Sequence, residues 1–445
     1  MSARTVVVGA GLSGLSAAWA LARAGREALL LEASPRPGGV VRSVAREGYL
    51  LELGPNTVRP TPELWTLVEE LGLAGEAIFA DPRAPRYVDF GGVLHPLPMS
   101  PGGLVRSRLL SGRGKRRLLT EPFRRAGGSP EESVRDFMAR RLGPEVADRL
   151  VEPFVAGIFA GSASRLSAAA ALPTLVRWER EHGSLFRGAL AGRRARKTSG
   201  SPAPPRGLLS FRAGLETLPK ALAARLGPAF RPSADVRAVS PRPGGGWTVH
   251  AAGGDLDADR ILLAAPAPVA ARLVESFAPD GAKALASVPH PPLAVLHLSW
   301  PDSALPRPLS GFGHLVCPDP ARRILGAVWS SSLFAGRAPA GHALLTVFLG
   351  GRRDPDALAL SDADLAEAAA RDLRAEGLVR GEPRLVQLTR WERAIPQYES
   401  GHAERLAVLG SAERRFPGLR FLGNYRGGIS VGDVVRSGLE AGSVA

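Results

Sequence analysis

Residues 5–14 read Thr-Val-Val-Val-Gly-Ala-Gly-Leu-Ser-Gly, and this stretch decides the fold. The β-branched run over residues 5–8 predicts a short buried strand, and the alanine- and leucine-rich segment after the glycines predicts a helix. Gly9 allows the tight turn between them, Gly11 lets the backbone approach a pyrophosphate, and Gly14 lets the helix pack closely on the strand. The helix N-terminus would face the phosphates, so the pattern predicts a dinucleotide site.

The residues that follow indicate which dinucleotide is bound. A second strand over residues 28–31 ends at Glu32, which is placed to bond a ribose hydroxyl. Residues 36–39, Arg-Pro-Gly-Gly, then supply a second glycine pair, and Arg36 and Arg42 supply cations. Flavoproteins carry this extension and nicotinamide enzymes generally do not. We therefore expect a flavin dinucleotide, with an ordinary Pro-Gly turn as the alternative.

Two further segments could approach the same ligand. Residues 54–57, Gly-Pro-Asn-Thr, offer a backbone-rich loop that could lie against a flavin ring. Residues 420–423 read as a strand, and the glycine-rich loop over 424–432 leads into a helix with Asp433 as its expected N-cap. For FAD, this helix dipole would stabilise the negative charge of reduced flavin. A strand-to-helix connection without a ligand is the alternative.

Composition restricts the class of protein. The chain has 445 residues, of which 45% are hydrophobic, so it can bury a large core in two or three domains. Basic residues outnumber acidic ones by 57 to 42, which favours an anionic partner, a membrane surface or an acidic substrate. Arginine with abundant Gly, Ala and Pro is also typical of a GC-rich genome. The single cysteine, Cys317, excludes an intrachain disulfide and predicts a reducing compartment and no metal site.

The chain shows no secretory leader and no apolar run of about 18 residues, so we expect a cytoplasmic protein, at most peripheral on the inner face of the cytoplasmic membrane. Residues 104–125 interleave arginines with leucines. Such a mixture could lie on an anionic bilayer or form a solvated loop over a core. Residues 193–205 read as a flexible basic linker. Nucleic-acid binding is not expected, because the linker has no aromatic residue.

The predicted fold class is α/β with α+β insertions, in which a Rossmann-like FAD-binding domain is built from non-contiguous segments. A mixed-sheet substrate-binding domain and a helical, basic, membrane-associating domain are inserted between those segments. The predicted bounds are 1–80, 206–285 and 385–445 for the FAD-binding domain, 81–99 and 286–384 for the substrate-binding domain, and 100–205 for the helical domain.

Several longer motifs together carry a family resemblance. They are ELGP (52–55), VRP (58–60), GGVLHPLP (91–98), RLGPEVA (141–147), GIFAG (157–161), GFGHLV (311–316), IPQY (395–398) with Gly401-His402, and the terminal glycine loop. On these motifs the chain resembles the oxygen-dependent protoporphyrinogen oxidases of the flavin amine-oxidase superfamily, over about residues 4–442. The nucleotide motifs indicate only the superfamily, whereas GIFAG, GFGHLV and IPQY look specific to porphyrinogen oxidases.

The resemblance implies one noncovalently bound FAD per chain. Relatives that bond flavin covalently use a cysteine near the terminal glycine loop, and Cys317 lies far from it in sequence. The residues matching family flavin contacts are Gly9, Ala10, Gly11, Leu12, Ser13, Gly14, Glu32, Ala33, Arg36, Gly39, Val40, Gly54, Pro55, Asn56, Thr57, Val236, Asn424, Ile429, Ser430 and Val431.

The resemblance also implies substrate contacts. Arg86 matches an arginine that pairs a propionate, and Gly157 matches a glycine whose backbone approaches the tetrapyrrole. The apolar walls would be Phe312, Leu315 and Phe348. Without the resemblance, a surface role for Arg86 and core packing for the apolar residues would be the simpler interpretation. No catalytic acid or base is assigned, and His182 and His314 are expected to be structural.

The implied activity belongs to heme biosynthesis: a six-electron oxidation of protoporphyrinogen IX to protoporphyrin IX, two electrons at a time through FAD to O2, with release of hydrogen peroxide. Oxidation of coproporphyrinogen III to coproporphyrin III is the nearest alternative. A carotenoid-type desaturase and a non-catalytic basic membrane-binding scaffold are more distant. The implied partners are the porphyrinogen, O2, an anionic membrane surface, a ferrochelatase that receives the product, and a second copy in a homodimer.

Overall fold

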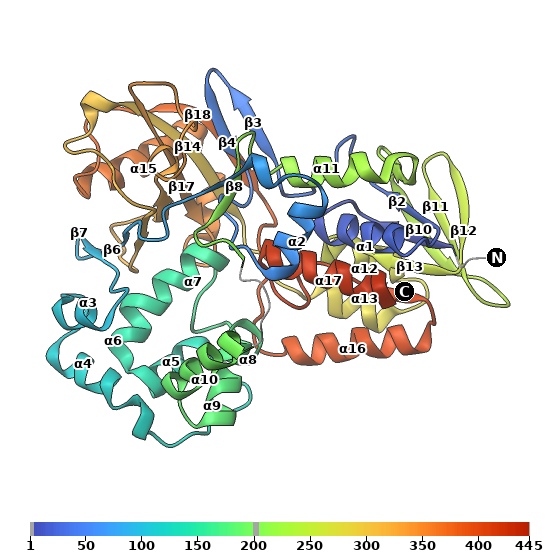
Figure 1. Ribbon diagram of the computed structural model, residues 1–445, viewed down its shortest axis with the longest axis horizontal. Coiled ribbons are helices and arrows are strands. Elements are labelled where there is room, and N and C mark those ends of the chain that lie inside the picture. The colour runs from blue at the N-terminus through green and yellow to red at the C-terminus, as the bar shows by residue number, and fades with distance from the viewer. Residues whose placement is uncertain (1–3, 199–203, 445) are drawn as a thin grey trace.

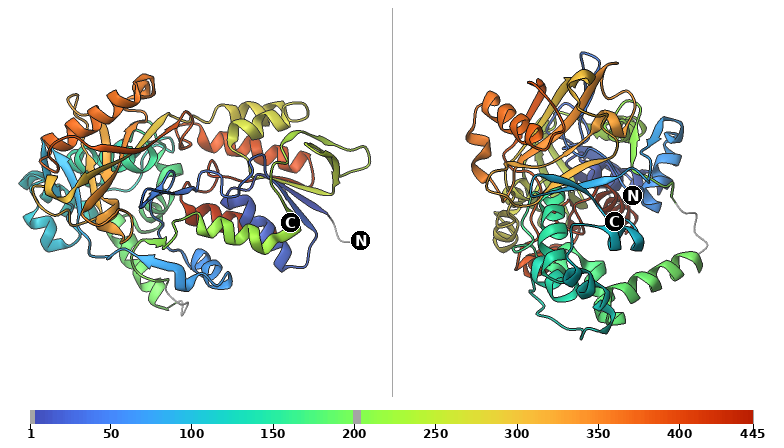
Figure 2. Two further views of the ribbon diagram at one scale, coloured as in Figure 1. Left: turned by 90° about the horizontal axis from the view of Figure 1, so that it is seen from above. Right: turned by 90° about the vertical axis from the view of Figure 1, so that its left-hand side faces the viewer.

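The computed structural model describes residues 4–198 and 204–444 (Figure 1). A seven-stranded sheet lies toward one end of an elongated molecule and a five-stranded sheet toward the other (Figure 2). The helices of residues 101–198 form a third part, beside the seven-stranded sheet. Within the described ranges, we find no helix that is long and apolar enough to cross a bilayer.

The strand predicted at residues 5–8 lies at the centre of the five-stranded sheet. The strand order is β19–β13–β1–β2–β9, and every neighbouring pair is parallel. Val6 and Val7 point to opposite faces and neither is exposed, so β1 is buried on both sides. Helices α1, α2, α11 and α17 cover one face, and helices α12, α13 and α16 with the β10–β12 sheet cover the other.

The elements of this part are β1 (Thr5–Val8), α1 (Leu12–Arg23), β2 (Ala28–Leu31), α2 (Pro62–Glu70), α11 (Thr217–Leu226), β9 (Phe230–Arg231), β10 (Val236–Pro241), β11 (Trp247–Ala251), β12 (Gly254–Ala258), β13 (Arg260–Leu263), α12 (Ala267–Val274), α13 (Pro279–Ala286), α16 (His402–Arg415), β19 (Leu419–Phe421) and α17 (Val431–Val444).

The seven-stranded sheet has the order β18–β14–β17–β16–β15–β6–β7. It is mixed, because β15 and β6 are parallel while the other neighbouring pairs are antiparallel. Helix α15 covers one face through Leu365, Ala369 and Leu373. The elements are β6 (Arg86–Phe90), β7 (Val93–Pro96), β14 (Leu293–Pro301), β15 (Gly313–Val316), β16 (Ile324–Val328), β17 (His342–Gly350), α15 (Asp362–Ala375) and β18 (Arg384–Trp391).

One predicted boundary is wrong. The sequence assigns the segment from residue 385 to the FAD-binding domain, but β18 pairs with β14 from Leu293 to Ser299 in the seven-stranded sheet. Strand β14 is buried along almost its whole length, so its backbone groups need hydrogen-bonding partners on both edges, and β18 supplies the second edge. The mixed polar and apolar residues of β18 do not themselves indicate which sheet the strand will join.

Two small sheets connect the larger parts. The hairpin of β3 (Ser43–Arg46) and β4 (Tyr49–Glu52) packs on the seven-stranded sheet, where Tyr49 Oη lies 2.8 Å from Ser299 Oγ. Strand β5 (Ala77–Phe79) pairs with β8 (Leu209–Phe211).

The helical part has a core of its own, which includes Phe137, Val155 and Leu166. In the basic run over residues 104–125, Leu109, Leu110 and Leu118 are buried, so part of that run is core packing. The elements are α3 (Pro101–Arg106), α4 (Gly112–Leu119), η2 (Glu121–Phe123), α5 (Val134–Leu142), α6 (Pro144–Val146), η3 (Ala147–Val151), α7 (Glu152–Phe159), α8 (Ala168–Ala171), α9 (Pro173–His182) and α10 (Leu185–Thr198).

The predicted linker over residues 193–205 begins too early. Helix α10 continues to Thr198, and residues 199–203 of the linker lie outside the described residues. Arginine, alanine and lysine are all good helix formers, so a dense run of positive charge does not by itself end a helix.

Candidate functional site

The glycine turn leaves open space at the N-terminus of α1. Gly9 has a φ of 101°, and a Cβ on Gly14 would lie 1.9 Å from the Gly9 carbonyl oxygen, so conformation and packing require these two glycines. Gly11 differs, because its φ is an ordinary −66° and no other segment of the described chain comes within 4 Å of its Cβ position. Room beside this backbone is what the approach of a pyrophosphate needs.

Glu32 is fixed at the edge of this space. One carboxylate oxygen accepts a hydrogen bond from the Ala10 N–H at 2.7 Å, and the other accepts one from the Ser34 N–H at 2.9 Å. The Ala234 N–H donates to the Glu32 carbonyl at 2.8 Å, which brings the predicted contact Val236 toward the same edge. The half-buried carboxylate is therefore held where a ribose hydroxyl would need an acceptor.

The Arg36 guanidinium is held by the protein itself. It donates to the Gly39 carbonyl at 2.8 Å and lies 3.6 Å from the Glu216 carboxylate. These contacts fold the second glycine pair over the first turn, and a Cβ on Gly39 would lie 3.3 Å from the Gly11 Cα. Three predicted flavin contacts are exposed at the rim of this region: Ala33, Gly39 and Val40.

Helices α1 and α17 lie side by side with their N-termini at the same end. A Cβ on Gly438 would lie 2.3 Å from the Ser13 carbonyl oxygen, and one on Gly442 would lie 2.3 Å from the Ala17 carbonyl oxygen. Both steps are four residues in the same direction, so the two helices are parallel and in close contact. The first turn of α1 has no acidic residue and no side-chain cap, which leaves its N–H groups and positive dipole end for an anion.

Tyr398, in the IPQY segment, fixes the glycine-rich loop before α17. Its hydroxyl donates to the Asn424 carbonyl at 2.5 Å and accepts from the Gly428 N–H at 3.1 Å. Its ring stacks on His402 with centroids 4.2 Å apart. Burial raises the pKa of Tyr398, so the hydroxyl stays protonated. Sequence reasoning recognised this segment as a signature but gave Tyr398 no role.

The N-cap of α17 is Ser430, and the prediction of Asp433 is wrong. The helix begins at Val431, and the Ser430 Oγ accepts the Asp433 N–H at 3.1 Å and donates to the Asp433 carboxylate at 2.5 Å. An N-cap residue precedes the first helical residue, whereas Asp433 lies in the first turn. The predicted contact Ile429 packs against the core of the helical part.

The loop over residues 54–57 crosses directly over the second glycine pair. A Cβ on Gly54 would lie 2.0 Å from the Val40 carbonyl oxygen, and the Asn56 amide donates to the Gly54 carbonyl at 3.1 Å. The Trp391 indole N–H donates to the Leu53 carbonyl at 3.0 Å, which ties the start of the loop to the seven-stranded sheet. The loop is thus held where the two large parts of the molecule meet.

A buried carboxylate, Glu52, anchors the strand before this loop, and sequence reasoning gave it no role. Its carboxylate accepts hydrogen bonds from the Ser43 Oγ at 2.6 Å and the Leu215 N–H at 2.9 Å, and it lies 3.2 Å from Arg337. Burial raises the pKa of Glu52 to about 7 against the lowering effect of Arg337 and Ser43. The Ser43 contact lies within the hairpin, the Leu215 contact ties it to the residues before α11, and the Arg337 contact ties it to the segment before β17.

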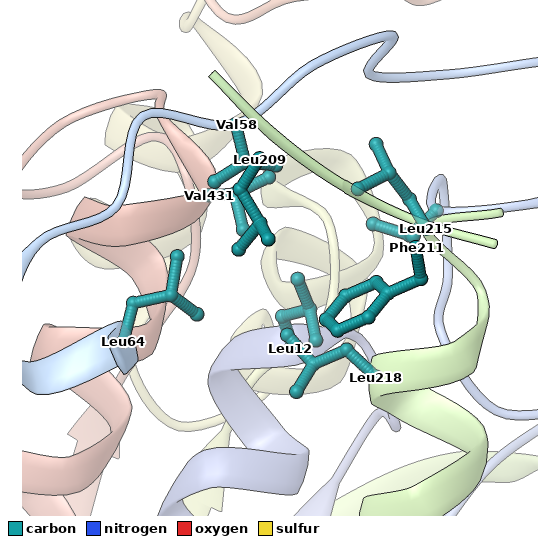
Figure 3. A pocket seen from close by; sticks show the side chains of 9 residues that line it. Leu12, Val58, Leu64, Leu209, Phe211, Leu215, Leu218 and Val431 are labelled. Carbon is teal, nitrogen blue, oxygen red and sulfur yellow. The ribbon is translucent and has the colours of Figure 1, made fainter. Parts of the chain in front are cut away.

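An apolar cavity lies beside the N-termini of α1 and α17 (Figure 3). Leu12 and Val431 are the first residues of those helices, and Figure 3 shows their side chains directed toward the same space. The remaining lining residues are Val41, Val58, Leu64, Leu209, Phe211, Leu215 and Leu218. All of these lining residues belong to, or pack against, the hydrophobic core on this face of the five-stranded sheet, so the cavity is a gap in the packing that holds the two helix N-termini together.

Strands β6 and β15 bring Arg86 and Phe312 together. The parallel register pairs Arg86 with Gly313, and the guanidinium carbon lies 5.4 Å from the centroid of the Phe312 ring. Arg86 is half-buried, and its side chain makes no ion pair or hydrogen bond within the described part of the chain. Burial, with the nearby charge of Arg59, lowers the pKa of Arg86, although arginine stays charged in proteins.

Helix α7 presses Gly157 against Leu315. A Cβ on Gly157 would lie 2.2 Å from Leu315 Cδ2, so the leucine side chain rests directly on the glycine backbone. Leu315 pairs with Gly326 and Gly326 with Phe348, which places Leu315 and Phe348 in one cross-strand row with a glycine between them. The predicted substrate residues therefore form two groups, Arg86 with Phe312 and Gly157 with Leu315 and Phe348. Strand β15 links the groups, because Phe312 directly precedes it and Leu315 lies on it.

Other titratable groups on or near β15 are buried and contact only other protein groups. The His314 Nε2 lies 3.0 Å from the Glu376 carboxylate, and the Trp329 indole N–H donates to His314 Nδ1 at 3.3 Å. Burial raises the pKa of Cys317 to about 12, so it remains a thiol, and it packs on Leu109. Among the residues that the structure describes, no three His, Cys, Asp or Glu side chains cluster as metal ligands.

Comparison with known proteins identifies the family to which the chain belongs. A model of the flavin containing amine oxidoreductase family matches residues 12–443. The chloroplastic protoporphyrinogen oxidase of Oryza sativa subsp. japonica is 35% identical, with 100% of this chain and 88% of the relative aligned. The protoporphyrinogen oxidase of Bos taurus is also 35% identical, with 99% and 98% aligned.

Solved structures of related proteins have the same fold. A crystal structure from Exiguobacterium sp. 255-15, provisionally described as a protoporphyrinogen oxidase, matches with a TM-score of 0.81 at 26% identity and covers 100% of this chain and 98% of its own. The cyclohexylamine oxidase of Brevibacterium oxydans IH-35A, at 18% identity and a TM-score of 0.72 with 100% and 98% covered, shares the fold. The chain belongs to the flavin-containing amine oxidoreductase family and, within it, groups with the protoporphyrinogen oxidases.

Proposed function

We propose that the protein binds one FAD noncovalently and oxidises protoporphyrinogen IX to protoporphyrin IX. The observation that carries this proposal is the Arg86 guanidinium, which covers the Phe312 ring and has no acidic partner among the described residues. Arg86 lies on β6, which pairs with β15, and β15 also carries Leu315, from which the apolar row runs to Phe348. A cation beside apolar walls fits a macrocycle that carries carboxylates at its edge. The plant and mammalian relatives named as protoporphyrinogen oxidases support the same substrate.

The residues at the N-terminus of α1 fit FAD. Gly11 would admit the pyrophosphate, the first N–H groups of α1 would donate to it, and Glu32 would accept from the ribose. When bound, FAD supplies a two-electron acceptor that O2 reoxidises with release of hydrogen peroxide, so six electrons correspond to three O2. Tyr398 holds the loop before α17 in place, and Ser430 caps that helix.

The protein's own part in the reaction is orientation and exclusion of water. Arg86 would pair with one propionate of the porphyrinogen, and Leu315 and Phe348 would cover the macrocycle. Leu315 rests on Gly157, so its side chain must move before a ring can lie against that backbone. We assign no acid or base to a side chain, since the pyrrole nitrogens can redistribute protons.

A porphyrin fluorescence assay tests the proposal. Purified protein is given protoporphyrinogen IX or coproporphyrinogen III, each prepared anaerobically, and the rate of porphyrin fluorescence is recorded after admission of air. We expect faster oxidation of protoporphyrinogen. A tenfold preference for coproporphyrinogen would assign the protein to the alternative reaction, and a preparation that takes up FAD but oxidises neither would refute both.

Replacing Arg86 by glutamine should raise the KM for protoporphyrinogen at least tenfold and change kcat less than threefold. The reason is that a charged hydrogen bond to a carboxylate contributes about 1.5–3 kcal/mol and would be lost from substrate binding. Arg83→Gln is the matched control, because Arg83 is a neighbouring exposed arginine outside the proposed site. Equal KM values for the two variants would remove Arg86 from the site.

We further propose that the helical part lies on an anionic membrane surface, on the inner face of the cytoplasmic membrane. Three apolar side chains of the 104–125 run are exposed, Val105 by 67%, Leu119 by 63% and Phe123 by 84%. Exposed arginines stand among them: Arg106, Arg108, Arg113, Arg116 and Arg125. Cations and apolar side chains on one segment favour an anionic bilayer interface. Homodimerisation and transfer of the product to a ferrochelatase stay predictions.

Vesicle co-sedimentation tests the membrane proposal. The Leu119→Asp/Phe123→Asp variant should bind vesicles of phosphatidylglycerol and phosphatidylcholine at least fivefold more weakly than the wild type, because each buried apolar side chain contributes about 1.5–3 kcal/mol. Val444→Asp, at an equally exposed valine in α17, is the control. If all three proteins sediment alike, the 104–125 run is not the membrane face.

A further inference from the structure

A second arginine, Arg59, is fixed in position by backbone pairing on the same side of the molecule as the cluster beneath Arg86. The Val58 N–H donates to the Leu209 carbonyl at 3.0 Å, and the Leu209 N–H donates back to the Val58 carbonyl at 2.7 Å. This bridge fixes the backbone of Arg59 alongside Leu208. The Val58 side chain is buried in the apolar cavity, whereas Arg59 is exposed.

The same apolar cluster supports both arginines. Leu208 and Phe312 pack in one cluster with Ala80, and Arg86 covers the Phe312 ring at 5.4 Å. The antiparallel bridge sets Arg59 opposite Leu208, and Arg86 covers Phe312, so each arginine stands beside a residue of this cluster. Burial lowers the pKa of Arg86, and the charge of Arg59 lowers it further.

Neither guanidinium is neutralised by a side chain of the described residues. Across residues 4–198 and 204–444, the side chains of Arg59 and Arg86 make no ion pair and no hydrogen bond. Arg140, by contrast, lies between the carboxylates of Glu132 and Glu179. Two like charges held close together without a counter-ion repel each other, and an arrangement of this kind is stabilised when anionic groups bind both.

We propose that Arg59 and Arg86 form a two-point carboxylate site, in which Arg59 binds a second carboxylate of the same substrate. This inference rests on the proposed function, because protoporphyrinogen carries two propionates on adjacent rings. One anchor leaves a flat macrocycle free to turn about the bound propionate, whereas two anchors fix its rotation. Arg59 is therefore a specificity-determining residue that selects a dicarboxylate edge and sets how the ring lies against the loop over residues 54–57.

Steady-state kinetics with two substrates test the pairing. The proteins are wild type, Arg59→Gln and the control Arg83→Gln, and the substrates are protoporphyrinogen IX and its monomethyl ester. Arg59→Gln should raise the KM for the free diacid about fivefold with kcat within twofold, which corresponds to about 1 kcal/mol for an exposed charge pair. On the monoester the same variant should differ from wild type by less than twofold, because Arg86 can hold the single carboxylate.

Binding without turnover gives the second readout. Titration of the oxidised protein with protoporphyrin IX, followed by porphyrin fluorescence, should show the same fivefold weakening in Arg59→Gln and none in Arg83→Gln. The flavin absorbance near 450 nm should be equal in all three proteins, since Arg59 is not assigned to the flavin. A KM increase of the same size on diacid and monoester would overturn the pairing, as would a binding constant equal to that of Arg83→Gln.

Different results would refute the proposed function and the proposed role of Arg59. If the wild-type protein oxidises neither protoporphyrinogen nor its monoester, the proposed function is wrong. If the wild type oxidises both and Arg59→Gln behaves like Arg83→Gln on each, the function stands and the second carboxylate contact is refuted.

Discussion

Replacing Gly11 by alanine should leave the apoprotein folded and weaken FAD binding about 30-fold. The backbone at Gly11 has an ordinary φ of −66°, and no other segment of the described chain approaches its Cβ position within 4 Å, so a methyl group meets only the space assigned to the pyrophosphate. Inserting a methyl group into a filled contact costs about 1–3 kcal/mol, and 30-fold corresponds to about 2 kcal/mol. The expected defect is therefore confined to the ligand.

Two measurements on the apoprotein check this expectation. Quenching of free FAD fluorescence gives the dissociation constant, and the thermal midpoint without flavin gives the stability. Gly14→Ala is the contrasting variant, because its Cβ would lie 1.9 Å from the Gly9 carbonyl oxygen and must move the helix from the strand. It should lose both stability and FAD affinity. If Gly11→Ala bound FAD as tightly as the wild type, the phosphates would not lie at this turn.

Replacing Arg141 by methionine should destabilise the helical part by about 3–5 kcal/mol. Arg141 lies on α5 with no exposed side-chain surface, and its Nε donates to the Glu121 carboxylate at 3.0 Å. It also donates to the Glu179 carboxylate at 3.3 Å and to the Gly183 carbonyl at 2.9 Å. One side chain thus joins three helical segments, α5, η2 and the end of α9, and its removal would leave the Glu121 carboxylate buried without its cation.

The pKa of Glu121 reflects the same network. Burial alone would raise it, but hydrogen bonds from Ser184, the Leu185 N–H and Arg141 outweigh burial, and the pKa of Glu121 is lowered. The carboxylate therefore stays ionised at neutral pH, which makes the loss of Arg141 costly. The Glu121→Met/Arg141→Met double variant should recover more than half of the lost stability, because both buried charges are then absent.

Thermal unfolding with limited proteolysis of the helical part measures the effect. Arg374→Met is the control, since the partners of Arg374, Glu367 and Glu382, are mostly exposed and such pairs contribute about 0–1 kcal/mol. We expect a large fall in thermal midpoint and early cleavage between α4 and α10 for Arg141→Met only. Equal stability of the Arg141 and Arg374 variants would show that the buried network does not hold these helices together.

The tertiary structure changed the interpretation of single residues more than that of motifs. Arg36 bonds within its own loop, Ser430 rather than Asp433 caps α17, and Tyr398 fixes the loop that the glycines only make flexible. The partners of Arg36 and Ser430 lie only three residues along the chain, whereas the partner of Tyr398 is not encoded by local spacing. A side chain's hydrogen bonds depend on which segments folding brings within about 3 Å, and Tyr398 and Asn424 are separated by 26 residues.

The sequence by itself determined the nucleotide-binding turn, because the conformation of that turn depends on interactions between residues close together in the chain. A β-branched strand, a glycine with positive φ at Gly9 and a glycine at Gly14 that allows close packing all follow from backbone sterics within ten residues. The motifs also carried the family resemblance, since they are read from residue order alone.

Only the tertiary structure decided how the site is assembled. Arg86 and Phe312 meet because β6 and β15 pair in parallel across more than 200 residues, and β18 joins β14 because a buried strand needs partners on both edges. The proximity of Arg59 to Arg86 likewise depends on the bridge between Val58 and Leu209. Such contacts arise from hydrogen-bond satisfaction and burial over the whole chain, which a local pattern does not contain.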